Sequence, residues 1–129
     1  MTTELNYLAW VIALTVLMWI PYIMNMIMVR GLMDAVGYPD SPKPMARWAE
    51  RMKYAHMNAV ENLVIFAPLV VVANLAGISN ETTVMACALY FWARLIHFVV
   101  YTMAIPWLRT FSFVAGFVAQ AMLVWQILL

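Results

Sequence analysis

The chain has 129 residues, of which 67% are hydrophobic and only 10% are charged, and its formal net charge is +1. A soluble domain usually contains about 45–50% apolar and about 25% charged residues, so this composition excludes a soluble globular protein and indicates an integral membrane protein. There is no basic run or tail, so we expect no nucleic-acid partner. The single cysteine, Cys87, excludes an internal disulfide and a cysteine-based metal site.

Four segments are apolar enough to cross a lipid bilayer, which takes about 20 residues per helix. We expect one membrane domain, residues 1–129, with helices at about 5–30, 45–76, 81–104 and 108–129. The first segment has no basic residue before it and is too long for a signal-peptide core, so we interpret it as a membrane-spanning helix. The predicted fold is all-α: an integral membrane four-helix bundle.

Prolines and turn-forming residues punctuate these helices. Pro21 is expected to kink the first helix, and Pro68 to bend the second. The segment 31–44 is rich in glycine and proline and is expected to be a loop. Ser79 or Asn80 is expected to cap the third helix.

Lysine and arginine are unevenly distributed among the connections. Cytoplasmic loops of membrane proteins are enriched in these two residues. Here they cluster at the first and third connections, so we expect these connections in the cytoplasm and both termini outside. The residues are Arg30, Lys43, Arg47, Arg51 and Lys53 at the first connection and Arg109 at the third.

Two rows of polar side chains run through the expected second and third helices. Their spacing places each row on one helical face, with arcs of roughly 100° and roughly 60° at about 100° per residue. Ionisable residues in membrane segments are costly, so such rows indicate a functional site. The first polar row is Arg47, Glu50, Arg51, Tyr54, Asn58 and Glu61; the second polar row is Tyr90, Arg94, His97 and Tyr101.

Antiparallel packing would bring parts of both rows to one membrane depth. Asn58 and Glu61 lie toward the cytoplasmic end of the second helix, and His97 and Tyr101 toward that end of the third. Arg109 opens the fourth helix at the same level. We therefore expect one pocket in the cytoplasmic leaflet. No histidine and carboxylate have a spacing that suits a metal ion, so we expect no metal site.

Structural roles for these residues remain open beside the functional ones. Arg94 and Glu61 are suited to an ion pair that sets helix register. His97 is more often an interhelical hydrogen-bonding residue than a proton shuttle. Arg109 is also suited to anchoring the helix at lipid headgroups. His56 lies on the opposite face of the second helix, where we interpret it as an interfacial or capping residue.

Two segments resemble signatures of the MAPEG superfamily, the membrane-associated proteins in eicosanoid and glutathione metabolism. Residues 50–61, Glu-Arg-Met-Lys-Tyr-Ala-His-Met-Asn-Ala-Val-Glu, are similar to its second-helix signature in the Arg, the Ala-His pair and the Asn-x-x-Glu. Residues 93–101 are similar to its third-helix signature, Ala-Arg-x-x-His-x-x-x-Tyr, and residues 106–109 resemble the start of its fourth helix. The resemblance, to a bacterial-type member, covers nearly the whole chain.

The resemblance implies a homotrimer in a bacterial inner membrane that binds glutathione as a thiol co-substrate in a cytoplasm-facing pocket between subunits. The implied function is a glutathione-dependent transferase or peroxidase acting on lipophilic electrophiles or lipid hydroperoxides, with Arg109 and Tyr101 as catalytic residues. The implied glutathione-binding residues are Arg51, Asn58, Glu61, Arg94, His97 and Tyr101. The eukaryotic family enzymes usually carry arginines where this chain has Tyr54 and Met57, so a non-catalytic lipid- or small-molecule-binding protein of the same fold is the alternative.

The chemistry of glutathione agrees with this residue set. Arg51 and Arg94 suit its two carboxylates, and Glu61 with the Asn58 amide suits its ammonium group. A free thiol has a pKa of about 8.5, so a nearby guanidinium such as that of Arg109 would favour the reactive thiolate. A proton-coupled transporter using the same ionisable residues is a third hypothesis, but four helices without an internal repeat argue against it.

Overall fold

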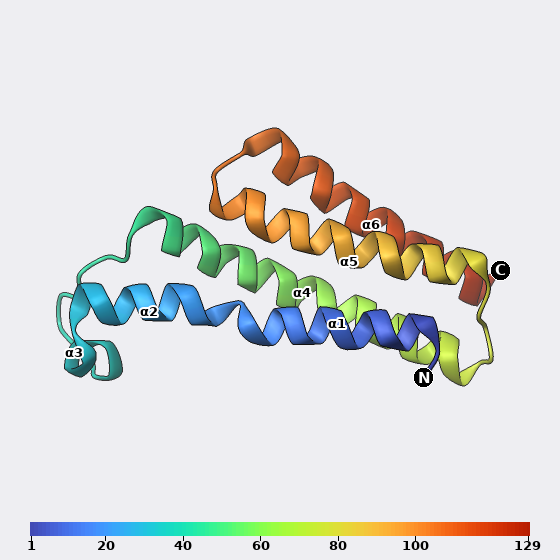
Figure 1. Cartoon of the computed structure of the whole chain (residues 1–129), viewed down its shortest axis with the longest axis horizontal. Coiled ribbons are helices and arrows are strands. Elements are labelled where there is room, and N and C mark those ends of the chain that lie inside the picture. The colour runs from blue at the N-terminus through green and yellow to red at the C-terminus, as the bar shows by residue number, and fades with distance from the viewer.

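The computed structural model describes all 129 residues. Its helices are α1 (Thr3–Leu17), α2 (Trp19–Arg30), α3 (Leu32–Val36), α4 (Arg47–Leu75), α5 (Glu81–Thr102) and α6 (Pro106–Leu128). Four spans, the first made of α1 and α2 together, are long and apolar enough to cross a membrane. The all-α, four-helix membrane bundle is thereby confirmed. Both termini lie at the same end as the α4–α5 connection, and the α2–α4 connection and the α5–α6 turn lie at the opposite end (Figure 1).

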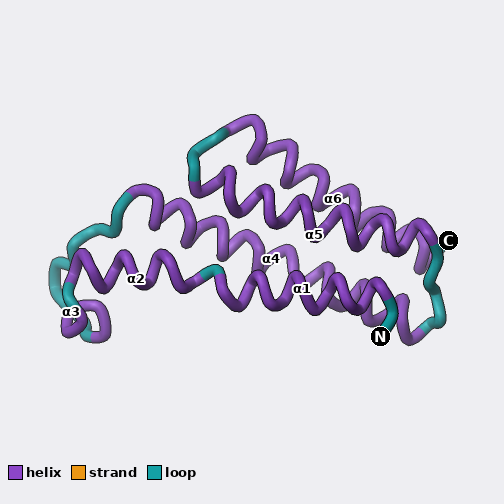
Figure 2. Tube along the Cα trace, viewed as in Figure 1, coloured by secondary structure: helices purple, strands orange, loops and turns teal.

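The first span is broken near its middle. Pro21 has no N–H to donate to the carbonyl of Leu17 four residues earlier, and its ring crowds that carbonyl. The helix breaks at Met18, whose N–H bonds Thr15 O at 3.3 Å (Figure 2). The expected kink is confirmed, but the span is two helical segments rather than the single helix expected. By contrast, α4 continues without a break through Pro68.

The segment expected to be a loop contains a helix. α3 lies between Gly31, whose φ of +80° is accessible mainly to glycine, and Gly37. The expectation of a loop throughout 31–44 is therefore wrong, because a short run with an acidic residue in its first turn forms a helical turn there. The start of α4 is held to α2 by Asn25 Oδ1, which accepts a hydrogen bond from Ala46 N at 3.0 Å.

The start of α5 carries a reciprocal cap. Asn80 Oδ1 accepts from Thr83 N at 3.0 Å, and Thr83 Oγ1 accepts from Asn80 N at 2.9 Å. Of the two expected capping residues, Asn80 is thus the one that acts. The Thr83 hydroxyl also contacts Glu4 Oε2 at 3.3 Å, which ties α1 to α5 inside the bundle.

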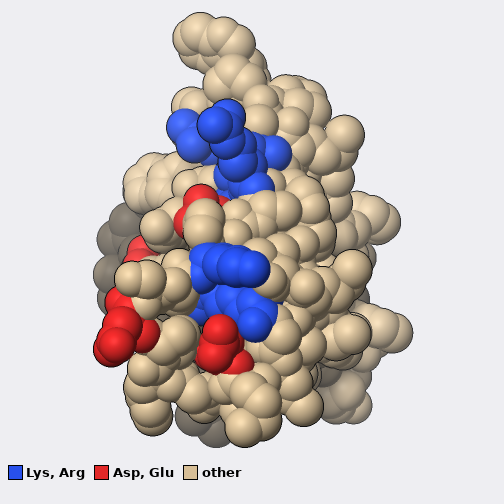
Figure 3. Space-filling model, turned by 90° about the vertical axis from the view of Figure 1, so that its left-hand side faces the viewer, with Lys and Arg blue, Asp and Glu red and all other residues tan.

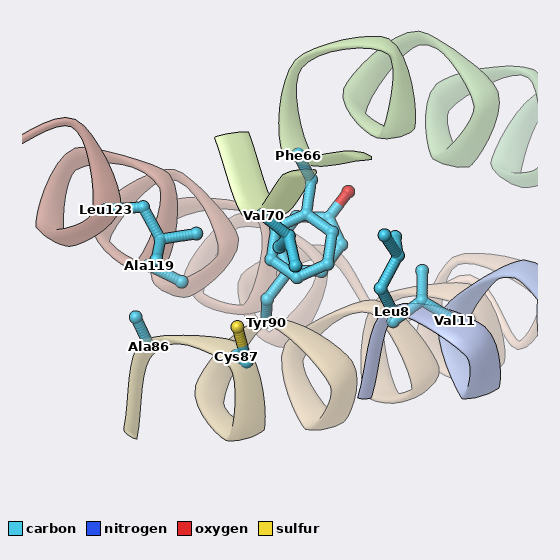
Figure 4. Packing of buried hydrophobic residues seen from close by; sticks show 9 residues of the cluster. All are labelled: Leu8, Val11, Phe66, Val70, Ala86, Cys87, Tyr90, Ala119 and Leu123. Atoms are coloured by element: carbon cyan, nitrogen blue, oxygen red, sulfur yellow. The ribbon is translucent and has the colours of Figure 1, made fainter. Parts of the chain in front are cut away.

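The core is built around α5, which packs against α1, α4 and α6. The aromatic rings of Phe66 and Tyr90 stack with centroids 3.7 Å apart and planes 6° from parallel (Figure 4). α4 and α5 also bury several alanines, whose small side chains let membrane helices approach closely. The buried cluster consists of Leu8, Val11, Phe66, Val70, Ala86, Cys87, Tyr90, Ala119 and Leu123.

α4 and α5 end in the same hydrogen-bonded turn. At the end of α4, Ile78 N bonds Ala73 O at 2.8 Å across Gly77, whose φ is +72°. At the end of α5, Ile105 N bonds Val100 O at 3.0 Å across Ala104, whose φ is +62°. Glycine is the usual residue at this left-handed position. The turn at Ala104 redirects the chain so that α6 begins at Pro106, close to the last turn of α5.

Candidate functional site

Charged side chains gather at one end of the bundle. Figure 3 views the end formed by α3, the α2–α4 connection and the α5–α6 turn, and shows two groups of lysine and arginine with acidic side chains beside them. The start of α4, the end of α5 and the start of α6 all lie at this end. The other end carries the termini and the α4–α5 connection.

The second polar row faces the interior of the bundle. Arg94 and His97 are each only 2% exposed, and Tyr90 is fully buried. They are covered because α5 has neighbours on three sides. Tyr101, one turn further along, is half-buried and opens toward the charged end.

Arg94 is held by one short hydrogen bond across the helix interface. Its Nη2 donates to Asn58 Oδ1 at 2.7 Å and lies 3.4 Å from His97 Nδ1. Its Nε and Nη1 are buried without a hydrogen-bond partner. The side-chain stem packs against α6, where a Cβ added to Gly116 would lie 3.6 Å from Arg94 Cδ. The Arg94 side chain therefore lies between α4 and α6, in contact with Asn58 and His97.

The first polar row mostly faces away from the bundle. α4 buries its alanine-rich face against the other helices, so the side chains of Tyr54 and Glu61 are exposed. Only two members of the row reach α5: Asn58, which binds Arg94, and Arg51, whose Nε donates to Thr102 O at 2.9 Å. The two rows thus meet along one edge of α4.

Two pockets at the charged end share two of their lining residues. The smaller, which we call the arginine pocket, has a volume of about 190 Å³ and is lined by Arg51, Tyr101, Ala104, Ile105, Pro106 and Arg109. The larger, the amide pocket, has a volume of about 320 Å³ and is lined by Asn58, His97, Tyr101, Arg109, Thr110 and Phe113. Because Tyr101 and Arg109 line both, a molecule bound in one pocket would lie beside the other.

Tyr101 and Arg109 form the shared wall. The guanidinium carbon of Arg109 lies 5.1 Å from the centroid of the Tyr101 ring, a cation–π arrangement. The turn at Ala104 produces this contact by placing the first turn of α6 next to the last turn of α5. The His97 ring stands edge-on to Tyr101 with centroids 5.6 Å apart.

Of the residues predicted for the site, five line the two pockets and two do not. Arg51, Asn58, His97, Tyr101 and Arg109 line a pocket; Arg94 and Glu61 line neither. Arg94 bonds Asn58 rather than Glu61, so the alternative of a structural Arg94–Glu61 pair does not hold within one subunit. The reason is that Glu61 projects from the exposed face of α4.

His56 has a partner on the other side of α4. Its Nδ1 lies 2.8 Å from the hydroxyl of Tyr22, which joins α4 to α2 just after the break in the first span. His56 is thus an interhelical hydrogen-bonding group rather than a helix cap, and its expected position at the membrane interface stays a prediction. It takes no part in either pocket.

Several residues near the pockets were not predicted from the sequence. Thr110 and Phe113 line the amide pocket, and Asn62 donates from Nδ2 to Asn58 O at 2.9 Å and to Asn58 Oδ1 at 3.2 Å. Gln120 Nε2 donates to Asn62 O at 3.1 Å. A signal for Asn62 was present, since it stands one helical turn after Asn58 on α4.

The fold and site together define an integral membrane helical bundle with a polar, arginine-containing pocket region at one end. The profile of the MAPEG family matches residues 7–129, and the chain belongs to this family of membrane proteins of glutathione and eicosanoid metabolism. A search of curated proteins finds no match.

Proposed function

We propose that this protein is a glutathione-dependent membrane enzyme, a transferase or peroxidase that acts on lipophilic electrophiles or lipid hydroperoxides. The observation that carries the proposal is the pair of adjoining pockets that share Tyr101 and Arg109, in a chain of a family whose members generally use glutathione. In this proposal the enzyme is a homotrimer in a bacterial inner membrane, with the charged end in the cytoplasm.

The residues on the pocket walls suit the chemistry. Arg51 uses Nε to bond Thr102 O, which leaves its terminal Nη groups for a glutathione carboxylate. Arg109, exposed at the rim of both pockets, would stabilise the thiolate, and the Tyr101 hydroxyl would donate a hydrogen bond to it. The thiolate then attacks an electrophile that reaches the pocket from the lipid, so the protein contributes thiolate stabilisation and alignment of the two substrates.

Glutathione binding is the direct test. Isothermal titration of the purified protein with glutathione should give a saturable signal that weakens about 10-fold or more in the Arg51→Ala variant, because a charge-assisted hydrogen bond is lost. Arg47→Ala is the matched control, since Arg47 is exposed one turn earlier on the same helix and lines neither pocket. Absence of any binding by the unaltered protein would contradict the proposal.

A non-catalytic binding protein is the second candidate. Two adjoining apolar grooves between α4 and α6, of about 550 and 270 Å³, favour it, and so does the exposure of Tyr54 and Met57, where related enzymes carry arginines. Activity separates the two candidates. No turnover of glutathione with a chlorinated aromatic electrophile or an organic hydroperoxide, together with a lipid that co-purifies, would favour the binding protein.

The trimer is tested separately. Light scattering on the detergent-solubilised protein, after subtraction of the bound detergent, should give the mass of three chains. A monomer that still binds glutathione would contradict the trimer without touching the proposed chemistry.

A further inference from the structure

The carboxamide of Asn58 has only one orientation that its neighbours permit. Arg94 Nη2 lies 2.7 Å from it, and an arginine side chain has hydrogen-bond donors but no acceptor. The atom of Asn58 that faces Arg94 must therefore be the oxygen, because the opposite orientation would place two donors against each other. Asn62 Nδ2 contacts the same oxygen at 3.2 Å and agrees with this assignment.

The groups that hold this orientation are themselves fixed. Arg94 is 2% exposed, and its stem lies against α6 at Gly116. Asn62 is anchored by its second bond, to Asn58 O at 2.9 Å. Gln120 ties α6 to the same turn of α4 through Asn62 O at 3.1 Å. The Asn58 oxygen is thus occupied from two helices.

The consequence concerns the other side of the carboxamide. Asn58 lines the amide pocket, its Nδ2 has no hydrogen-bond partner in the protein, and that nitrogen is not among the buried unpaired atoms. The two N–H groups of Asn58 are therefore the part of the amide that a bound molecule meets. With the Arg109 guanidinium on the same pocket, this wall offers hydrogen-bond donors.

We propose that Asn58 is a specificity-determining donor that selects a carboxylate or thiolate at this point of the pocket, and that Asn62 is a positioning residue that keeps its amide turned this way. This differs from the expectation that the Asn58 amide accepts from the ammonium group of glutathione. An acceptor oxygen is no longer available there, because Arg94 and Asn62 occupy it. The identity of the ligand as glutathione rests on the proposed function.

The first experiment compares glutathione with three blocked forms: one esterified at the glycyl carboxylate, one amidated at the glutamyl carboxylate, and one acetylated at the amine. Blocking the group that meets Asn58 should weaken binding about 10-fold in the unaltered protein and have little effect in Asn58→Leu. We expect that group to be a carboxylate or, if neither carboxylate shows the effect, the thiol, tested with the S-methyl form. If instead acetylation of the amine weakens binding to the unaltered protein but not to Asn58→Leu, the proposal is overturned.

The second experiment does not depend on glutathione. The side-chain amide signals of Asn58, identified by their loss in Asn58→Asp, are followed by nitrogen-15 NMR while sodium formate or methylammonium chloride is added. Formate should shift these signals and methylammonium should not. In Asn62→Leu the formate shift should fall at least about 3-fold, as expected when one of two hydrogen bonds that orient a group is removed.

Asn74→Leu is the matched control, since Asn74 is an exposed asparagine near the other end of α4. It should leave the formate response unchanged. A shift of the Asn58 amide signals caused by methylammonium but not by formate would overturn the role of Asn58. An unchanged formate response in Asn62→Leu would overturn the role of Asn62. If the protein binds no glutathione yet responds to formate as described, the proposed function fails while this inference stands.

Discussion

Arg94 carries a positive charge into the middle of the bundle with an amide and an imidazole, rather than a carboxylate, as its hydrogen-bonding neighbours. Two of its three side-chain nitrogens, Nε and Nη1, are buried without a hydrogen-bond partner. A buried charge without an opposite charge generally costs stability, so its presence here is better explained by what it does to Asn58 and the pocket than by a contribution to folding.

Replacement of Arg94 by methionine should separate these two roles. We expect the free energy of unfolding to change by less than about 1 kcal/mol or to rise, because methionine fills similar space without a buried charge. Glutathione affinity should fall about 10-fold, since Asn58 loses its strongest orienting contact. Thermal unfolding in detergent and isothermal titration measure the two effects. A loss of more than about 3 kcal/mol in stability would indicate a partner for Arg94 that one chain does not contain.

Arg109 should act on the reaction more than on binding. It lies at the rim of both pockets over the Tyr101 ring, where its charge would favour a thiolate. We expect Arg109→Ala to lower kcat about 100-fold, the usual effect of removing one electrostatic stabiliser of the transition state, with a smaller change in the glutathione Kd. Arg47→Ala should keep its kcat. Equal losses in kcat for both variants would assign Arg109 a general effect on membrane insertion.

The helix ends show how local backbone chemistry positions the site. The same turn closes α4 at Gly77 and α5 at Ala104, but only glycine adopts its left-handed conformation without steric cost. Ala104 therefore holds a strained conformation beside the arginine pocket, which it also lines. The same turn leads into α6, whose Arg109 lies against the Tyr101 ring.

Substitutions at the two turns should have opposite effects. Ala104→Gly should raise the free energy of unfolding by about 1 kcal/mol, because the left-handed conformation costs alanine about 1–2 kcal/mol and glycine loses part of this gain through backbone entropy. Gly77→Ala should lower it by about 1 kcal/mol for the same reason. The Gly77→Ala result is not complicated by a steric clash, because a Cβ added at Gly77 has nothing within 4 Å. Thermal unfolding in detergent measures both, and changes of the same sign would contradict the explanation.

The bundle as a whole presents its basic connections at one end and its termini at the other. The distribution of lysine and arginine predicts that the basic end is cytoplasmic. The single cysteine, Cys87, is buried and is removed by Cys87→Ala, which leaves a background without thiols. Ser41 in the α2–α4 connection and Ser79 in the α4–α5 connection are both exposed and lie at opposite ends.

Labelling with a membrane-impermeant thiol reagent on intact cells tests this orientation. In the Cys87→Ala background, the Ser79→Cys variant should react without permeabilisation and the Ser41→Cys variant only after it. The reverse pattern would place the pockets at the outer leaflet. Because glutathione is a cytoplasmic thiol in the proposed reaction, that result would also count against the proposed function.

Much of this protein was predictable from the sequence alone. Composition and the length of four apolar runs determined the membrane class and the helical spans, because lipid requires a spanning helix to satisfy its own backbone. Single residues determined local structure in the same way. Pro21 predicted the distortion of the first span, and Asn80 was one of the two residues expected to cap α5. The two signatures indicated the family, and the profile match confirms it.

Only the tertiary structure decided which polar residues meet. Helical spacing places a row on one face but does not say which neighbour that face contacts. Packing of the alanine face of α4 turned most of the first polar row outward, separated Glu61 from Arg94, and left Asn58 at the edge that touches α5. The unexpected contacts of Asn62 and Gln120 follow from the same packing, because a hydrogen bond between helices depends on their relative rotation and depth.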